Sequence, residues 1–130
     1  MKPIARIDLD TAEELVNFSG RSGNTFSFAK QQLEGAVALH NLLAAEGFAY
    51  IADEVGMGKT YVALGTIALL RHFNPELRVL YIVPKENLQR KWQKEARNFA
   101  TKNWLAVDHR VKTFQDTPAR QLVSCSNLLD

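Results

Sequence analysis

The stretch YIADEVGMGKT, residues 50–60, constrains the fold of this 130-residue chain more than any other part of the sequence. It overlaps an apolar run that starts at Phe48, and it is followed by YVALGTIALLRHF, in which apolar residues recur at helical spacing. Gly56 and Gly58 have no Cβ, so the backbone can turn sharply there and bring its N–H groups close to an anion. The stretch therefore predicts a buried strand, an anion-binding turn and a helix, in that order.

Three interpretations of this turn are open from the residues alone. In the first, Asp53 and Glu54 end the strand as catalytic carboxylates that hold magnesium and position water. In the second, the turn binds nucleotide phosphates, with the charge of Lys59 on the β- and γ-phosphates and the hydroxyl of Thr60 on Mg²⁺. The third is a glycine-rich turn with an incidental lysine. The second interpretation accounts for most residues, although Asp53 occupies the position of the first glycine in the strict pattern G-x-x-x-x-G-K-[ST].

Two helices are predicted before this stretch. Residues 29–45 form a long helical segment that ends before Gly47. Nearer the amino terminus, Thr11 and Glu14 have the Thr-x-x-Glu spacing of a capping box, in which Thr11 would begin a short helix. We therefore expect an amino-terminal helix and connector over residues 1–25 and the main domain over residues 26–130.

A second apolar run, residues 79–83, predicts another strand, buried between helices as in a parallel sheet. Pro84 ends the run. The helix that follows has Leu88, Trp92, Ala96 and Phe99 on one stripe, so Trp92 is interpreted as a packing residue rather than a base-stacking one. The other side of this helix, which is either a solvated face or a contact surface, carries Arg90, Lys91, Lys94 and Arg97.

The segment ADEVGMGKT resembles the first motif of superfamily 2 helicases and translocases, especially the Swi/Snf-like (DEAH-type) branch, which has an acidic residue in place of the first glycine. Upstream, QQLEGAVAL is similar to the adenine-reading segment of that family. Downstream, RVLYIVPKENLQRKWQKEARNF is similar to its next motif. The resemblance covers residues 28–99 and implies an α/β fold of the P-loop NTPase (RecA-like) class, a parallel sheet flanked by helices, as an incomplete first lobe.

The resemblance also implies a site for ATP and Mg²⁺. Lys59 is the expected catalytic residue, and Thr60 is the expected Mg²⁺ ligand through its hydroxyl. The amide of Gln32 is expected to read the adenine, because it can donate and accept hydrogen bonds side by side. Without the family pattern, Gln32 would be interpreted as a solvated residue on a helix. The expected nucleotide-binding residues are Gln32, Asp53, Glu54, Val55, Gly56, Met57, Gly58, Lys59 and Thr60.

A nucleic acid is the expected partner. In the family that the sequence resembles, the segment after the second strand lies beside the nucleic-acid backbone, which implies contacts at Pro84 and Lys85. DNA is expected more than RNA. The charge distribution agrees, because residues 1–54 hold eight acidic and four basic side chains, whereas residues 55–130 hold six acidic and twelve basic ones. Phosphates would be attracted to the basic half, which begins at the glycine-rich turn.

Composition favours one cytoplasmic domain with a hydrophobic core. No apolar run reaches the roughly 18 residues that a membrane span needs, so no membrane partner is expected. The first residues, MKPIARIDLD, lack the features of a secretory signal. Cys125 is the single cysteine and cannot form an internal disulfide, which is typical of a reducing compartment.

The predicted function is that of the ATP-binding portion of a nucleic-acid-dependent ATPase, either a helicase or a double-strand translocase. Hydrolysis in this class requires a second acidic motif, and residues 61–130 contain no adjacent Asp-Glu pair. We therefore expect the 130-residue chain alone to be inactive, truncated before the DEAH-type motif, with the rest of the helicase core beyond residue 130. The alternatives are a nucleotide-binding signalling switch and a truncated fragment without catalysis.

Overall fold

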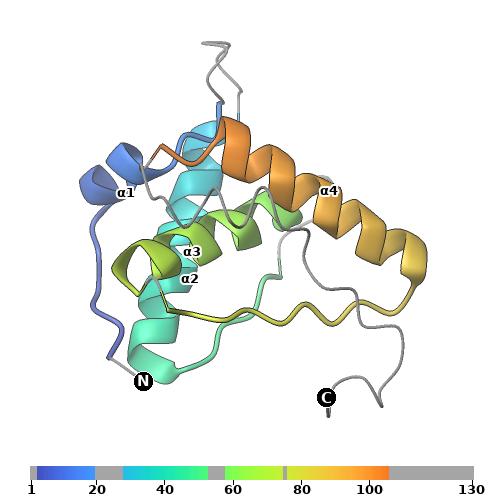
Figure 1. Ribbon diagram of the computed structural model, residues 1–130. Helices are drawn as coiled ribbons and strands as arrows, with labels where there is room; N and C mark the ends of the chain where they lie inside the picture. Colours follow the sequence, from blue (N-terminus) through green and yellow to red (C-terminus); the bar gives the residue numbers. More distant parts are fainter. Residues whose placement is uncertain (1–2, 20–27, 53–57, 75, 106–130) are drawn as a thin grey trace.

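Helix α3 lies at the centre of the fold. The computed structural model describes residues 3–19, 28–52, 58–74 and 76–105. These residues form α1 (Leu9–Leu15), α2 (Ala29–Glu46), α3 (Lys59–Phe73) and α4 (Glu86–Lys102), and Figure 1 shows α3 between α2 and α4. Helix α3 contacts each of the other helices, and α1 also packs against α2. None of the described helices is long and apolar enough to cross a membrane.

The helix ends follow from local chemistry. Helix α2 ends one residue later than predicted, at Glu46, and Gly47 takes the left-handed conformation (φ +78°) that glycine adopts without strain. The prediction that Thr11 begins the first helix is wrong. Asp8 is the cap of α1, and its carboxylate accepts a hydrogen bond from the Thr11 backbone N–H at 2.8 Å. Aspartate is at least as good a cap as threonine, so the helix begins at the earlier of the two candidates.

The core lies around α3, where the other helices pack against it. Aromatic rings fill its centre: Phe18 packs edge-on against Phe99 at 5.9 Å between ring centroids, and Tyr61 lies 5.9 Å from Phe99 on the other side. Small residues elsewhere in the core allow the helices to approach closely. The buried cluster consists of Ala12, Val16, Phe18, Leu33, Ala36, Leu64, Ala68, Leu69, Ala96, Phe99, Ala100 and Trp104.

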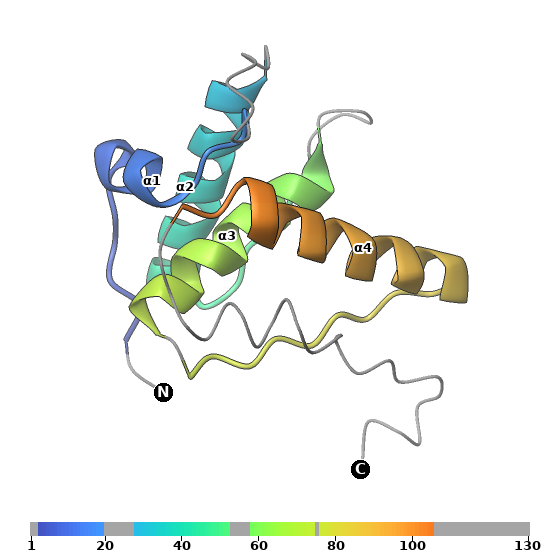
Figure 2. The ribbon, with the colours of Figure 1, turned by 45° about the horizontal axis from the view of Figure 1, so that its top comes forward.

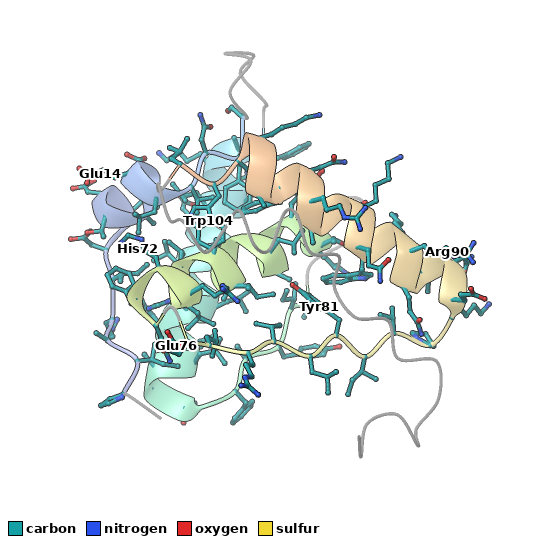
Figure 3. All side chains as sticks on the ribbon, viewed as in Figure 1. Glu14, His72, Glu76, Tyr81, Arg90 and Trp104 are labelled. Atoms are coloured by element: carbon teal, nitrogen blue, oxygen red, sulfur yellow. The ribbon has the colours of Figure 1, made fainter. Side chains whose placement is uncertain are left out.

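An isolated antiparallel bridge between Val16 and Trp104 joins the end of α1 to the end of α4. The Asn17 backbone N–H donates to the Asn103 carbonyl at 2.8 Å, and the Asn103 side-chain amide donates to the Asn17 carbonyl at 2.7 Å. Val16 and Trp104 are 2% and 4% exposed. In Figure 3 the Trp104 side chain lies among the helices, so the bridge closes over the core.

The segment before α1 is held on α2 by two consecutive side chains. Asn41 pairs with the backbone of Ile7, accepting from its N–H at 2.9 Å and donating to its carbonyl at 3.0 Å. Nε2 of His40 lies 2.8 Å from the Ala5 carbonyl. A carbonyl can only accept, so Nε2 carries the proton in this contact.

The predicted parallel sheet is wrong. The described residues contain no strand, and the isolated bridge is the one β-type pairing among them. Residues 48–52 and 77–83 carry no helix, as expected, but they form no ladder, and Figure 2 shows residues 76–85 running beneath α3 and α4 as an extended chain. Several of their large apolar side chains are exposed rather than buried: Tyr50 is 82% and Ile82 80% exposed. Apolar runs indicate a tendency to be buried, but pairing requires a partner strand, which the described helices do not supply.

Tyr81 is the part of the second extended segment that turns inward. Its ring lies 5.4 Å from that of Trp92, and both side chains pack against the core cluster. The interpretation of Trp92 as a packing residue is therefore confirmed. This contact holds residues 77–83 beside α4 without a sheet.

Candidate functional site

The amino terminus of α3 is an open turn built on Gly58. Gly58 has φ +71° and ψ +41°, a left-handed conformation that strains other L-residues. The Val62 N–H donates to the Gly58 carbonyl at 3.1 Å, which is the first hydrogen bond of the helix. No side chain of the described residues caps this end. The first N–H groups of α3 therefore point out of the helix, where its dipole favours an anion.

Lys59 and Thr60 are the first two residues of α3, and both are half-buried. The helix behind them is fixed to α2. Val62 is 3% exposed, and the Thr66 hydroxyl lies within hydrogen-bond reach of the Val62 carbonyl (2.9 Å) and the Ala36 carbonyl of α2 (3.4 Å). The two residues predicted to contact phosphate and magnesium thus lie at the fixed end of a central helix.

Gln32 lies against this turn. Its side chain is 6% exposed, so it is not a solvated residue of the helix surface. Its amide nitrogen Nε2 occupies the space that a Cβ at Gly58 would fill. A side chain at position 58 is therefore excluded by the Gln32 amide as well as by the backbone angle. The structure brings together two predicted site residues that are far apart in the sequence.

The remaining predicted residues divide into two groups. Pro84 and Lys85 are exposed, in the turn that leads into α4, and the Lys85 carbonyl accepts the first hydrogen bond of that helix from Gln89 at 3.0 Å. Among the predicted nucleotide-binding residues, those that lie outside the described residues are Asp53, Glu54, Val55, Gly56 and Met57.

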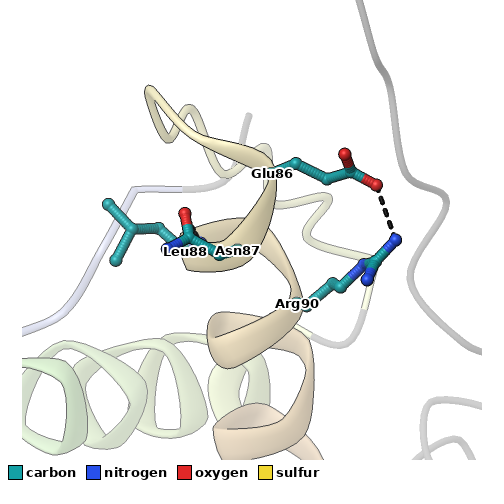
Figure 4. A network of polar contacts seen from close by, with 4 residues as sticks. All are labelled: Glu86, Asn87, Leu88 and Arg90. Atoms are coloured by element: carbon teal, nitrogen blue, oxygen red, sulfur yellow. Dashed lines mark hydrogen bonds and ion pairs between the residues drawn. The ribbon is translucent and has the colours of Figure 1, made fainter.

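Ion pairs follow the exposed side of α4. Glu86 pairs with Arg90 at 2.7 Å, and Figure 4 shows this pair one turn apart at the start of the helix. Lys91 and Glu95 are 3.9 Å apart. Both pairs are i, i+4 pairs on a helix surface, where such contacts contribute only tenths of a kcal/mol.

Two tyrosines, one in α3 and one in the extended segment beside it, have pKa values raised from the ordinary value of a phenol. Burial raises the pKa of Tyr61, and the Glu95 carboxylate raises it further. Burial also raises the pKa of Tyr81, against a smaller opposing effect of the Arg71 guanidinium. Both phenols are therefore protonated at neutral pH, where they pack against Phe99 and Trp92. Within the described ranges, no three His, Cys, Asp or Glu side chains gather as they would to hold a metal ion.

Sequence reasoning missed the direct contact between Gln32 and Gly58. The two residues stand in different elements, and no periodicity relates their positions. The family motifs predicted that both touch the nucleotide, but not that they touch one another. The signal for such a contact is non-local and appears only when α2 packs on α3.

One of the comparisons with known proteins identifies a family. The family model of the type III restriction enzyme res subunit matches residues 25–122, which include Gln32, the glycine-rich turn and α4. No curated protein and no solved structure matches the chain. The family match extends over about three quarters of the chain. The chain therefore belongs to the family of the type III restriction enzyme res subunit, whose domain is a helicase-type, ATP-binding P-loop domain of superfamily 2.

Proposed function

We propose that this chain binds ATP and Mg²⁺ as the nucleotide-binding part of a nucleic-acid-dependent ATPase, a helicase or double-strand translocase related to the Swi/Snf-like branch. The observation that carries the proposal is the contact between the Gln32 amide and Gly58 at the open end of α3. The family match supports it, because the matched residues include all three motifs.

The residues at this turn fit a nucleotide. Free N–H groups at the start of α3 and the ammonium group of Lys59 would bind the phosphates, which Lys59 would stabilise during phosphoryl transfer. The hydroxyl of Thr60 would coordinate Mg²⁺. Gln32 would read the adenine with the amide that already lies against the turn. ATP supplies the transferable phosphoryl group, and residues 53–57 would complete the loop around it.

The partner in this proposal is a nucleic acid, with DNA favoured over RNA. Pro84 and Lys85 would contact its backbone, which agrees with the exposure of both residues at the start of α4. We expect no useful ATP hydrolysis by residues 1–130 alone, because they lack the second acidic motif that orients the attacking water. We place the protein in the cytoplasm.

The test is ATP binding by titration calorimetry in the presence of Mg²⁺, with Lys59→Ala compared with Arg78→Ala. Arg78 is an exposed cation outside the turn, so its replacement removes the same charge without touching the site. We expect Lys59→Ala to weaken binding about 10-fold or more, as loss of a hydrogen bond to a charged group predicts. Equal affinity of wild type and Lys59→Ala would refute the phosphate assignment.

Base recognition is tested separately with Gln32→Ala. We expect this variant to lose preference for ATP over GTP while it still binds triphosphate through the turn. Far-UV circular dichroism checks that the buried site still folds. An unchanged preference would mean that Gln32 only packs against Gly58.

A further inference from the structure

Helix α4 concentrates the positive charge of the protein. It holds five basic and two acidic side chains, a net charge of +3, whereas the rest of the chain holds eleven basic and twelve acidic ones, a net charge of −1. The net charge of +2 on the whole chain therefore arises from this helix alone. A field of one sign on a single element attracts polyanions to that element.

The cations lie on one face of α4. An α-helix turns by about 100° per residue. Arg90, Lys94 and Arg97, at i, i+4 and i+7, therefore form one row along the helix, and Lys91 and Lys102 lie beside this row. All five are exposed. The opposite face, with Ala96, Phe99 and Ala100, is buried in the core cluster. The helix cannot rotate its cations inward without exposing that apolar face, so the charged side is fixed toward the outside.

The acidic side chains of α4 neutralise only part of this face. Glu86 and Glu95 lie at its two borders, where they pair with Arg90 and Lys91. Lys94 and Lys102 form no ion pair with any residue of the described part of the chain. In Figure 3 Arg90 lies near the amino-terminal end of α4 and points away from the other helices. The middle and the carboxyl end of the face therefore present uncompensated lysines.

The spacing of these charges matches a phosphate backbone. From residue 90 to residue 102 the helix rises about 18 Å, at about 1.5 Å per residue. One strand of B-DNA carries a phosphate per about 3.4 Å of axis, so this length corresponds to about five phosphates. Five cations stand over the same length.

We propose that the outward face of α4, formed by Arg90, Lys91, Lys94, Arg97 and Lys102 and here termed the α4 cationic face, binds the phosphate backbone of duplex DNA. The nucleic-acid class rests on the proposed function, but the surface is distinct from the turn at Pro84 and Lys85. The aromatic side chains of α4, Trp92 and Phe99, pack toward the core, so α4 itself places no aromatic ring among these cations. Stacking on aromatic rings is how single strands are held. The apolar side of α4 is buried, so it is not available for insertion into a lipid surface.

The experiment measures binding of a labelled, mixed-sequence duplex of about 20 base pairs by fluorescence anisotropy, between about 50 and 200 mM salt. The variant is Lys94→Gln with Lys102→Gln. The matched control is Arg6→Gln with Lys30→Gln, which removes two exposed cations elsewhere. We expect the variant to lower the slope of log affinity against log salt by about 1.8, since each phosphate contact contributes about 0.9. Between about 50 and 200 mM salt the variant should therefore lose about 12-fold less affinity than the wild type does. The control should have the same slope as the wild type.

Other outcomes overturn the inference and separate it from the proposed function. An unchanged slope in the variant, with binding lost in Lys85→Ala, would move the interface to the turn before α4 and leave the proposed function intact. Absence of duplex binding by the wild type, or equal binding to polyglutamate, would refute a DNA-binding role for the α4 cationic face. ATP affinity is measured in parallel. If the wild type does not bind ATP, the proposed function alone is refuted. The variant should bind ATP with the same affinity as the wild type.

Discussion

Replacement by alanine should have opposite effects on the stability of the protein at Gly35 in α2 and at Gly65 in α3. Both lie inside helices, where alanine is favoured over glycine by about 0.8–1.0 kcal/mol. At Gly35 an added Cβ would lie 3.4 Å from Cγ1 of Val62, which is an ordinary contact. At Gly65 it would lie 2.5 Å from Cζ of Phe18 and 3.3 Å from both Cε atoms. The first site has room for a methyl group, and the second does not.

The magnitudes follow from these surroundings. Gly35→Ala should keep most of the helical gain and stabilise the protein by about 0.5–1 kcal/mol. At Gly65 the Phe18 ring must move, but it is only 8% exposed and packs edge-on against Phe99. Overpacking of this kind costs about 1–3 kcal/mol, so after the helical gain Gly65→Ala should destabilise by about 1 kcal/mol. The two variants should differ in sign.

Urea and thermal unfolding, both followed by far-UV circular dichroism, measure the two effects as changes in free energy and in melting temperature. The expected shifts in melting temperature are about 4 °C per kcal/mol, upward for Gly35→Ala and downward for Gly65→Ala. Adding Phe18→Leu should cost less in the Gly65→Ala background than in the wild type, with a coupling above about 0.5 kcal/mol. Equal stabilisation by both alanines, or no coupling to Phe18, would refute the packing of Phe18 against Gly65 of α3.

Three further outcomes are expected. Asn41→Asp keeps the acceptor for the Ile7 N–H but places a carboxylate against the Ile7 carbonyl, so amide hydrogen exchange at Ile7 should accelerate relative to wild type; unchanged protection would show that this pairing does not hold the segment. Hydrogen bonds from Thr11 lower the pKa of Asp8 below 3.8, so its contribution to stability is present above that value and is lost as the pH falls through the lower, folded-state pKa. The Thr11 amide resonance should titrate with it, and should not in Asp8→Asn, which caps without ionising; a resonance that stays constant in the wild type contradicts the cap. Ile82→Lys should reduce self-association in sedimentation velocity, because residue 82 is 80% exposed on an extended segment that pairs with no strand of the described residues; identical sedimentation of the two proteins would argue against this.

The helices could be predicted from the sequence, because their signals are local. Apolar periodicity predicted the helices after the glycine-rich turn and after Pro84, and α2 ends within one residue of its predicted end. The sheet could not be predicted in the same way. The apolar runs at 48–52 and 79–83 indicate burial, but strand pairing depends on contacts between distant residues, and the structure leaves most large apolar side chains of both runs exposed.

The candidate site shows the same division between local and non-local information. The motif predicted that Gly58 precedes a helix starting with Lys59 and Thr60, and the structure has a helix there. The contact of Gln32 with Gly58 depends on how α2 packs against α3, which no local pattern encodes. The sequence allows two interpretations of the charged side of α4, a solvated face or a contact surface. The uncompensated lysines can be identified only from the exposure and the ion pairs of the folded helix.

The bridge between Val16 and Trp104 has a consequence for the protein during its synthesis. Its flanking residues, Asn17 and Asn103, are 86 positions apart, whereas Thr66 and Ala36, which link α2 and α3, are 30 apart. Closing the longer loop in an unfolded chain costs about 0.9 kcal/mol more, so the bridge between the ends of α1 and α4 should form after α2 and α3 have packed. At about 5–20 residues per second, Val16 leaves the ribosome about 4 to 18 s before Trp104. For that interval Val16 lacks its partner in the bridge, and the end of α1 is accessible to chaperones that bind exposed apolar segments of a nascent chain.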